Sequence, residues 1–330
     1  MAEIARAAER AGADVVLLTD HDTLEARRRA EEGHHGPVLV LVGHEVSPPD
    51  RNHMLAFDTE TEIDHRRLSA AEIAQAVRDA GGFGFAAHPF SHGSKRFGRL
   101  GSLGTAMAWE DLDCLDGLEV WSFLSDNGEN VASLREAVSF IARPERYVTH
   151  PPQQNLDEWD RLGGRRRVVG IGGLDAHQFG RRIGGRVIRP MGYARSFRQL
   201  RTHVLTEELL TGELGHDRRQ LYDALREGRC YIAANALAPA RGFRFWATAP
   251  GGELPMGGEG KAADGPWDLR AELPRPAGVR LLRDGQELTR AETPALAHRA
   301  TGPGVYRVEA RLDAHGSERT WILSNPIYLR

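Results

Sequence analysis

The sequence predicts a mixed α/β protein with two domains, an α/β domain over residues 1–238 and a small antiparallel β-sandwich over residues 239–330. In the first part, short apolar runs alternate with helical segments, which is typical of a parallel sheet with crossover helices. After about Ala240 the apolar residues recur at every second position instead, which favours short antiparallel strands. The length of 330 residues also exceeds what one hydrophobic core usually supports.

The first half of the α/β domain begins with a predicted helix over residues 2–11, ended by Gly12, and a second helix is expected over residues 23–32. Ser69 and Glu72 have the spacing of a capping box, which predicts a helix from there to Ala80. Strands are predicted at residues 14–19, 38–42, 54–57 and 83–87. Continuous apolar runs of this length indicate strands that are covered on both faces.

The rest of the chain contains the remaining predicted elements of the α/β domain and the strands of the second domain. Further strands of the α/β domain are expected at residues 117–121 and 168–172, with helices over 127–141 and 217–226. The alternating strands of the second domain are expected at residues 243–247, 279–283, 305–312 and 321–323. Residues 249–265 are rich in glycine and proline, which predicts a loop inside that domain.

The composition excludes several classes of protein. With 43 Lys and Arg against 46 Asp and Glu, the net charge is −3, which argues against a dedicated nucleic-acid binder. Two cysteines, Cys114 and Cys230, make no disulfide framework and suggest a reducing compartment. The longest apolar run, residues 38–42, is too short to span a bilayer, and the first residues have no signal-peptide core. We therefore expect a cytoplasmic protein without a membrane or nucleic-acid partner, and its oligomeric state stays open.

The histidines are concentrated in the first two thirds of the chain. Of fourteen, twelve lie before residue 217, although aromatic and β-branched residues continue to the C-terminus. Histidine chemistry, if present, is therefore expected in the α/β domain. A general abundance of histidine on the surface would explain this distribution equally well. The spacing of the histidines therefore has to distinguish between the two explanations.

Residue types that bind metals follow several predicted strands directly. They are Asp20, His21 and Asp22; His44 and Glu45; His88; Glu119; Asp175 and His177; and, just before a short strand, His53. Functional residues gather at the carboxyl ends of parallel strands, where the loops converge. Asp, Glu and neutral His are ligands for Zn, Mn or Fe(II). Their recurrence at one structural position predicts a shared polynuclear metal site.

Each of these residues alone also has an ordinary explanation. His21 could be a solvated turn residue, Asp20 and Asp22 could cap the following helix, and His88 could be a loop histidine. Glu45 could be a surface carboxylate. His44 is not expected to be a ligand even if Glu45 is, because adjacent strand residues point to opposite faces.

The segments TDHDT, GHEVS, AHP, EVW and GLDAH, in this order, resemble the motifs of the PHP family, the polymerase and histidinol phosphatase domain. The resemblance covers about residues 1–235. The C-terminal segments RLLRDG, GVYRVEARL and WILSNPIYL are similar to the β domain of PHP metallohydrolases of the carbaryl-hydrolase-like group. The resemblance implies a distorted β/α barrel that holds two or three divalent metal ions, which would be Zn, Mn or Fe.

The resemblance also implies a role for each ligand. Glu45 corresponds to the bridging carboxylate, and His53 and His88 would complete the second metal site with it. Asp175 would belong to the first site. His21 and His177 would serve the third, and Glu45 and Asp175 would be central to catalysis.

One part of the family pattern is absent. The family's opening strand ends in a His-x-His pair followed by an aspartate, and this chain contains no His-x-His. We therefore expect a barrel that lacks its first strand, with unpaired edges on the neighbouring strands, and fewer bound metals. The expectation follows that the functional protein has an upstream strand that carries the pair.

The expected chemistry is metal-assisted hydrolysis, in which a cation activates a water molecule. The leading expectation is a phosphoesterase acting on a small-molecule ester. Arg181 and Arg182 could clamp a phosphate, as could Arg186 and Arg189, although solvated surface charge explains these arginines equally well. Two alternatives stay open: a carboxylic or carbamic ester hydrolase on the same metals, and a catalytically impaired binding protein.

Overall fold

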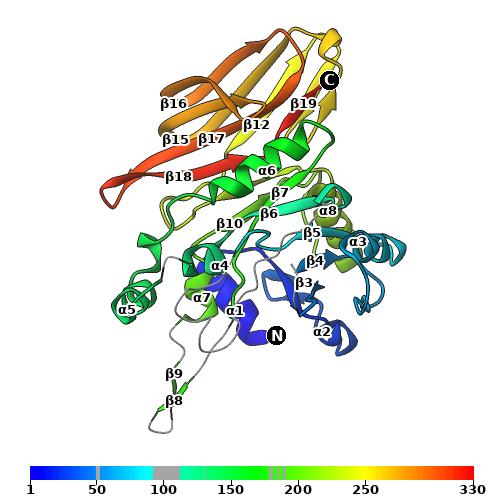
Figure 1. Ribbon diagram of the computed structural model, residues 1–330, viewed down its shortest axis with the longest axis vertical. Coiled ribbons are helices and arrows are strands. Elements are labelled where there is room, and N and C mark those ends of the chain that lie inside the picture. Colours follow the sequence, from blue (N-terminus) through cyan, green and yellow to red (C-terminus); the bar gives the residue numbers. More distant parts are fainter. Residues whose placement is uncertain (50–52, 92–111, 130, 178–180, 184–185, 189–190) are drawn as a thin grey trace.

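The chain folds into two sheets that follow one another along the long axis of the molecule (Figure 1). The computed structural model describes residues 1–49, 53–91, 112–129, 131–177, 181–183, 186–188 and 191–330. A curled sheet with helices around it forms one end, and a predominantly antiparallel sheet forms the other. The mixed α/β class expected from the sequence is confirmed.

The described residues contain eight α-helices and three short 3-10 turns. The α-helices are α1 (Ala2–Ala11), α2 (Glu25–Arg28), α3 (Ala70–Asp79), α4 (Phe123–Gly128), α5 (Leu134–Ala142), α6 (Gln153–Gly163), α7 (Tyr193–Ser196) and α8 (Leu214–Arg226). The 3-10 turns are η2 (Leu112–Cys114), η3 (Pro144–Arg146) and η4 (Ala262–Asp264). None of the helices in this described part of the chain is long and apolar enough to cross a bilayer.

Two helix boundaries differ from the sequence prediction. The helix expected over residues 23–32 is only the single turn α2, because the chain turns into a strand at Gly33. The helix expected over residues 127–141 is divided into α4 and α5, and Ser133 with Glu136 forms a capping box that starts α5. The capping box of Ser69 and Glu72 begins α3 as predicted.

The first sheet has seven strands. They are β1 (Val15–His21), β2 (Gly33–His35), β3 (Val38–Val46), β4 (Met54–Phe57), β5 (Phe83–Ala86), β6 (Gly117–Ser122) and β7 (Val169–Gly173). The order is β1-β3-β4-β5-β6-β7, with β2 beside β3. The expectation of a parallel sheet is wrong for β4, which is antiparallel to both β3 and β5, and the short strand β2 is also antiparallel to β3. The connection from β3 to β4 is too short for the crossover that a parallel pair requires.

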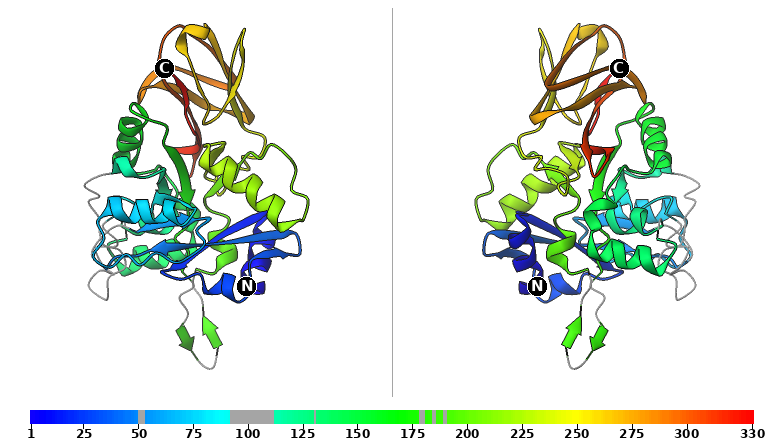
Figure 2. Two further views of the ribbon diagram at one scale, coloured as in Figure 1. Left: turned by 90° about the vertical axis from the view of Figure 1, so that its right-hand side faces the viewer. Right: turned by 90° about the vertical axis from the view of Figure 1, so that its left-hand side faces the viewer.

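The seven-stranded sheet curls into a half-barrel whose end strands are β1 and β7 (Figure 2). Its inner face packs Leu41, Phe85 and Ile171 against Leu221 and Leu225 of α8. Helix α1 covers the outer face of β1 and β3, and α3 and α6 contact β5 and β6. Because β1 and β7 do not pair with each other, the sheet has a seam along one side.

The second sheet has ten strands. They are β10 (Arg201–Val204), β11 (Cys230–Ala233), β12 (Arg244–Ala249), β13 (Gly252–Pro255), β14 (Glu259–Gly260), β15 (Trp267–Arg283), β16 (Gln286–Ala300), β17 (Gly304–Ala314), β18 (Ser317–Ser324) and β19 (Ile327–Leu329). Strands β10 and β11 lie before residue 239, so the sheet crosses the domain boundary drawn from the sequence. The expected loop over residues 249–265 contains β13 and β14, so its assignment as irregular structure was wrong. A two-stranded hairpin, β8 (Arg181–Ile183) and β9 (Arg186–Ile188), extends from the opposite end of the molecule (Figure 1).

The long β15–β16 hairpin joins two layers of the second sheet. Residues 268–272 of β15 pair with β12, and residues 278–283 pair with β17. The ladder between β15 and β16 is irregular between Glu272 and Ala277. Pro274 and Pro276 lie in this interval and cannot donate main-chain hydrogen bonds. One core, which includes Phe245, Val308 and Trp321, fills the space between the layers.

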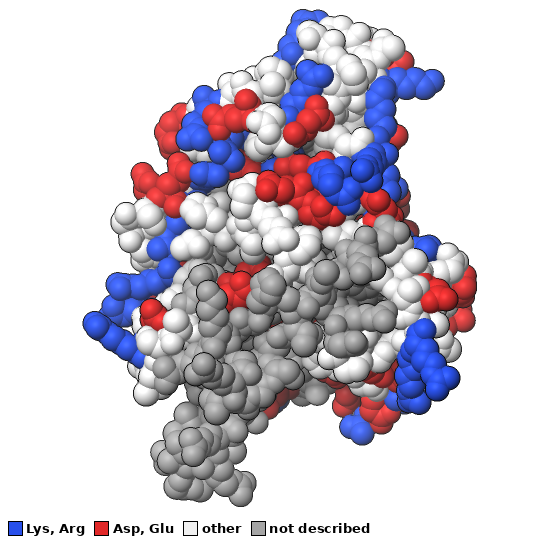
Figure 3. Space-filling view, viewed as in Figure 1, with Lys and Arg blue, Asp and Glu red and all other residues white. Residues whose placement is uncertain are grey.

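Acidic and basic side chains are interspersed over the antiparallel sheet on the face seen in Figure 3. Many of them pair across neighbouring strands, as Arg311 of β17 does with Glu318 of β18 at 2.6 Å. Exposed pairs of this kind stabilise a fold little, so they determine the solubility of the surface more than its stability.

A buried ion pair connects the two sheets. Arg307 of β17 is 2% exposed and donates from two nitrogens to the two carboxylate oxygens of Asp160 on α6, each at 2.7 Å. The third guanidinium nitrogen donates to Glu309 at 2.6 Å. Because a buried arginine without its partner is costly, this pair couples the packing of α6 to the second sheet.

We predict that Asp160→Ala lowers the free energy of unfolding by about 3 kcal/mol, because it leaves the Arg307 charge buried without its bidentate partner. Urea denaturation followed by circular dichroism measures the change. Glu158→Ala on the same helix is the matched control, since Glu158 pairs with the partly exposed Arg161, and it should cost less than about 1 kcal/mol. Equal losses in the two variants would contradict the coupling role.

Candidate metal centre

The half-barrel brings the six predicted ligand residues to one end of its strands. His21 ends β1, Glu45 lies near the end of β3, and His53 directly precedes β4, which runs in the opposite direction. His88 follows β5, and Asp175 and His177 follow β7. Since β4 is antiparallel to its neighbours, its beginning lies where the other strands end, and His53 therefore joins the group.

Glu45 is the centre of the cluster. Its carboxylate is 5% exposed, and its Oε1 lies 2.5 Å from His53 Nδ1 and 3.4 Å from His88 Nε2. Its Oε2 lies 3.8 Å from His21 Nδ1. Three histidines from three different segments thus surround one buried carboxylate.

His21 and His177 face one another through their Nε2 atoms, which are 3.3 Å apart. Ser47 Oγ donates its proton to the carbonyl of Glu45, so at His21 Nδ1, 2.6 Å away, it acts as an acceptor. At His177, Nδ1 lies 3.0 Å from the carbonyl oxygen of Asp175 and 3.2 Å from its carboxylate, and both are acceptors. The hydrogen bonds therefore assign the proton of each neutral ring to Nδ1 and a lone pair to Nε2.

When His177 is protonated, its Nε2–H donates to the Nε2 lone pair of His21, and a cation bound between the two nitrogens would take the place of that proton. Two nitrogens bound to one tetrahedral zinc ion at about 2.05 Å are about 3.3 Å apart, which equals the observed separation. One ligand atom from each of His21, Glu45 and His53 also lies within 4.8 Å of the others. The donor types and spacings therefore fit a divalent cation.

The charges in the cluster support the same interpretation. Burial opposes ionisation of Glu45, but the hydrogen bonds from His53 and His88 outweigh it and hold the pKa of this carboxyl well below its usual range. Burial also acts to lower the pKa of His88, yet Glu45 and the charges of Glu119 and Asp175 raise it to about 9. The hydrogen bond to Asp175 raises the pKa of His177 to about 9. The cluster thus attracts positive charge.

Left-handed backbone conformations also concentrate at this site. Asp22, His88 and Asp175 have φ angles of 53°, 32° and 47°, which residues other than glycine rarely adopt. Each lies just after a strand that contributes a ligand, β1, β5 or β7. Strain of this kind persists where the surroundings enforce it and often marks functional sites.

Glu119 holds the main chain of the site in place. This β6 carboxylate is 2% exposed, and its Oε2 accepts the main-chain N–H of His88 at 2.7 Å. Burial raises the pKa of Glu119 to about 7. A Cβ at Gly173 would lie 1.9 Å from Glu119 Oε1, so only glycine leaves room for this carboxylate. A carboxylate within the apolar run of the strand predicted over residues 117–121 is the sequence signal that marks Glu119.

Two serines complete the site and carry no distinctive sequence signal. Ser125 at the start of α4 donates to Asp175 Oδ2 at 2.5 Å, and Ser47 contacts His21. Such partners orient metal ligands and set which nitrogen carries the proton. They become visible only when distant segments are brought together.

His44, Asp22 and Asp20 were also singled out from the sequence, and none of them is one of the six side chains of the cluster. His44 lies on the opposite face of β3 from Glu45, where Ile63 N–H approaches its Nε2 at 3.4 Å, and burial lowers its pKa to about 4. Asp22 does not cap α2; it accepts the main-chain N–H of Ser47 at 2.8 Å. Asp20 is exposed. The expected substrate-binding side chains of Arg181, Arg182, Arg186 and Arg189 lie outside the described residues.

A cavity of about 1170 Å³ adjoins the cluster. Its walls include His21, Glu45, His88, Asp175 and His177 at one end and apolar residues of β1, β7, α7 and α8 beyond them. A site with a polar cluster at the end of a large apolar cavity is typical of small-molecule binding sites.

No protein-family model matches the chain, and a search of the curated proteins finds no match either.

We predict that Glu45→Gln weakens binding of Zn²⁺ by at least about 100-fold, because it removes the anion at the centre of the cluster. The matched control is His44→Asn, which changes the adjacent residue on the opposite face of β3. This variant should retain its zinc. Elemental analysis after dialysis against a defined zinc buffer measures both. Equal loss of zinc in the two variants would contradict the assignment of Glu45 as a ligand.

We also predict that metal binding releases protons. His88 and His177, with pKa values of about 9, are protonated at pH 7.5 in the metal-free protein and must lose these protons to bind a cation. About two protons should therefore be released at pH 7.5, and affinity should rise with pH until about 9. Calorimetry in buffers of different ionisation enthalpy measures the number. A value of zero would contradict the prediction that both histidines give up a proton when the cation binds.

Proposed function

We propose that the protein is a divalent-metal-dependent hydrolase that uses a metal-activated water molecule. The observation that carries the proposal is the cluster of six ligand-type side chains around the buried Glu45, which come from β1, β3 and the segments before β4, after β5 and after β7. Structural ion pairs use one partner of each sign, whereas this cluster places four imidazoles around two carboxylates beside a cavity. An excess of imidazole donors is characteristic of a transition-metal site.

We further propose that the chain is a PHP-type protein whose sheet forms an open barrel. The support is the order of the motifs along the sequence together with their positions at the strand ends. The half-barrel is compatible with a distorted β/α barrel that lacks one strand between β1 and β7.

The residues of the cluster would have different roles in binding the cations. Glu45, His53 and His88 would hold one cation, and His21, His177 and Asp175 would bind in its vicinity. When bound, such cations lower the pKa of a water molecule and stabilise negative charge that forms on the substrate. Ser125 and Ser47 orient Asp175 and His21, and Glu119 positions His88 through its main chain.

A phosphate ester is the first candidate substrate, since the resemblance to histidinol phosphatases favours it. A carboxylic or carbamic ester is the second candidate. The apolar walls of the cavity, which include Leu17, Ile171 and Leu174, favour an ester with a bulky apolar group. A protein that binds metal without turnover is the alternative of a different class.

We predict that the protein loaded with Zn²⁺ or Mn²⁺ hydrolyses p-nitrophenyl phosphate, and that a chelator abolishes the activity until metal is restored. Glu45→Gln should lower kcat/KM by about 100-fold or more, because without that anion the cation is neither held nor oriented. His44→Asn should retain the activity. Absorbance of released nitrophenolate measures each rate.

The same assay with an aryl N-methylcarbamate separates the candidates. Hydrolysis of the carbamate alone would replace the phosphoesterase by the second candidate. Stoichiometric metal without turnover of either ester would contradict hydrolysis and leave a metal-binding protein.

A further inference from the structure

Four side chains away from the metal cluster form a row in which carboxylates and imidazoles alternate. Glu208 Oε2 lies 3.0 Å from His216 Nε2, and His216 Nδ1 lies 3.0 Å from Asp217 Oδ1. The other carboxylate oxygen of Asp217 lies 3.0 Å from His34 Nε2. The row therefore joins three parts of the fold, which are strand β2, the beginning of α8, and the segment 205–213 that leads from β10 to α8.

Asp217 is the fixed member of the row. Its side chain is fully buried and accepts the main-chain N–H groups of Thr211 at 2.7 Å and Gly212 at 2.9 Å. Burial opposes ionisation, but the hydrogen bonds from His216, Thr211 and Gly212 outweigh it and hold the pKa of Asp217 well below its usual range. Asp217 is therefore an ionised carboxylate, which only accepts hydrogen bonds.

His216 is the member of the row whose contacts require a positive charge. Each of its two ring nitrogens faces a carboxylate oxygen, so each nitrogen needs a proton of its own. The neutral ring carries one N–H and would present a lone pair to one of the two oxygens. His34 differs, because its contact with Asp217 uses Nε2 alone and needs one proton in either charge state.

The carboxylates around His216 favour its protonation. The hydrogen bonds to Asp217 and Glu208 raise the pKa of His216. Glu213, the N-cap of α8, is a third carboxylate here and accepts the main-chain N–H of His216 at 2.5 Å. Arg219, on the next turn of α8, interacts with Glu213. Since a cation near the N-terminus of a helix is usually unfavourable, the carboxylates account for the charge of His216.

Loss of one proton from His216 would release Glu208 rather than Asp217. The neutral ring keeps its one N–H on Asp217, which is buried and cannot turn away from it. The side chain of Glu208 is 69% exposed, so it can rotate into water once the Nε2 lone pair faces it. The contact between the segment 205–213 and His216 is thus the one that depends on the charge.

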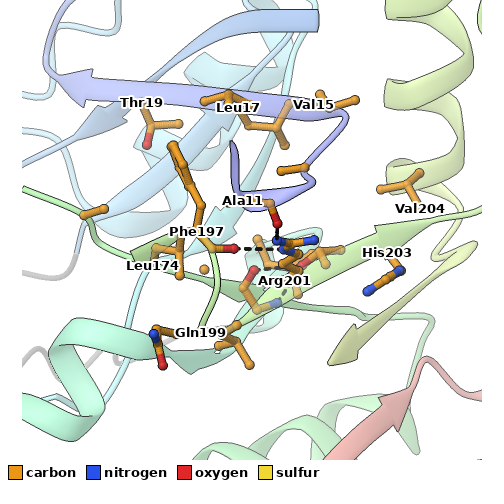
Figure 4. A pocket seen from close by; sticks show the side chains of 18 of the residues that line it. Ala11, Val15, Leu17, Thr19, Leu174, Phe197, Gln199, Arg201, His203 and Val204 are labelled. Atoms are coloured by element: carbon orange, nitrogen blue, oxygen red, sulfur yellow. Dashed lines mark hydrogen bonds between the residues drawn. The ribbon is translucent and has the colours of Figure 1, made fainter. Parts of the chain in front are cut away.

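The segment that Glu208 holds forms part of the cavity wall. Val204, at the end of β10, lines the cavity (Figure 4), and so do Thr206, Leu209 and Leu210 of the segment. Leu209 is 88% exposed and Leu210 is 36% exposed, so apolar packing does little to fix this part of the chain. Its position depends on its polar contacts instead.

Two further polar contacts of the segment do not involve His216. The main-chain N–H of Glu208 donates to Gln220 Oε1 on α8 at 3.1 Å, and Glu207 pairs with Arg229 at 3.0 Å. Contacts of this kind with exposed partners are weak. Loss of the contact with His216 should therefore make the segment more mobile without unfolding it.

We infer that His216 is a pH-dependent clasp, which holds residues 206–210 against α8 when its ring is charged and releases them when the ring is neutral. Below about pH 6.5, the ordinary pKa of histidine, the clasp is closed. Because the pKa of His216 in the folded protein is raised, the clasp opens as the pH rises through that higher value. The inference does not depend on hydrolysis or on metal, since the row shares no residue with the cluster.

A nitroxide spin label at position 209 tests the clasp in the full-length chain without metal. Leu209→Cys provides the attachment site, because that side chain is exposed, and Cys114→Ser removes a partly exposed thiol. Electron paramagnetic resonance measures the ratio of mobile to immobile label. We expect this ratio to be about fivefold larger at about pH 9 than at about pH 6, since an ion pair with an exposed partner contributes that much.

Three variants of the labelled chain assign the effect to the row. His216→Gln cannot become charged, so the mobility of its label should be the same at both pH values. In Glu208→Gln the amide accepts from the charged ring and donates to the neutral ring, so the segment should stay held at both pH values. His34→Gln is the matched control, because it keeps a donor for Asp217, and it should retain the full pH dependence. Circular dichroism confirms that each variant is folded.

Nuclear magnetic resonance follows the same proton directly, and the signal of His216 is the one that His216→Gln removes. Its pKa should lie above 6.5 and should fall in Glu208→Gln. A pKa at or below 6.5 would overturn the inference, as would equal mobility of the label at the two pH values in the parent chain. A folded His216→Gln variant that retains the pH dependence would assign it to another group and would overturn the inference as well.

Discussion

The candidate metal centre of this protein depends on one buried carboxylate. Glu45 is held near the end of β3, a strand that is buried at every residue, and three histidines approach it from other segments. A buried anion is stable only when it is neutralised. The histidines neutralise Glu45 in the metal-free protein, and a divalent cation could take their place. The backbone at His88 and Asp175, next to this carboxylate, is left-handed.

The second sheet contributes to the site without supplying a ligand. Through Thr202 and Asn325 it satisfies the edge of β7, and through the pair of Arg307 and Asp160 it is coupled to α6. Strand β7 carries Asp175 and His177 at its end. The antiparallel sheet therefore positions one half of the metal cluster, while α1 and β3 position the half that belongs to β1.

Much of the site could be predicted, because it depends on local pattern. Apolar runs marked the strands of the half-barrel, and the polar residues next to the strand ends marked the side chains that gather in the cluster, including His53 before β4. Glu119 could be found from its place within an apolar run. Ser47 and Ser125 could not, since serine is common and their role arises only from contacts between segments far apart in the sequence. The short strands β10 and β11 were missed for the same reason: their pairing with each other and with β18 stabilises them, and no local period marks them.

The sequence by itself determined the alternation of strands and helices, the period-two strands of the second sheet, and the residue types at the strand ends. These follow from side-chain polarity and spacing, which act over a few residues. Only the tertiary structure decided the direction of β4, the division of β15 between two layers, and the seam between β1 and β7 with its cavity. Each of these depends on which strand edges find partners, and that is settled by packing between segments that lie far apart along the chain.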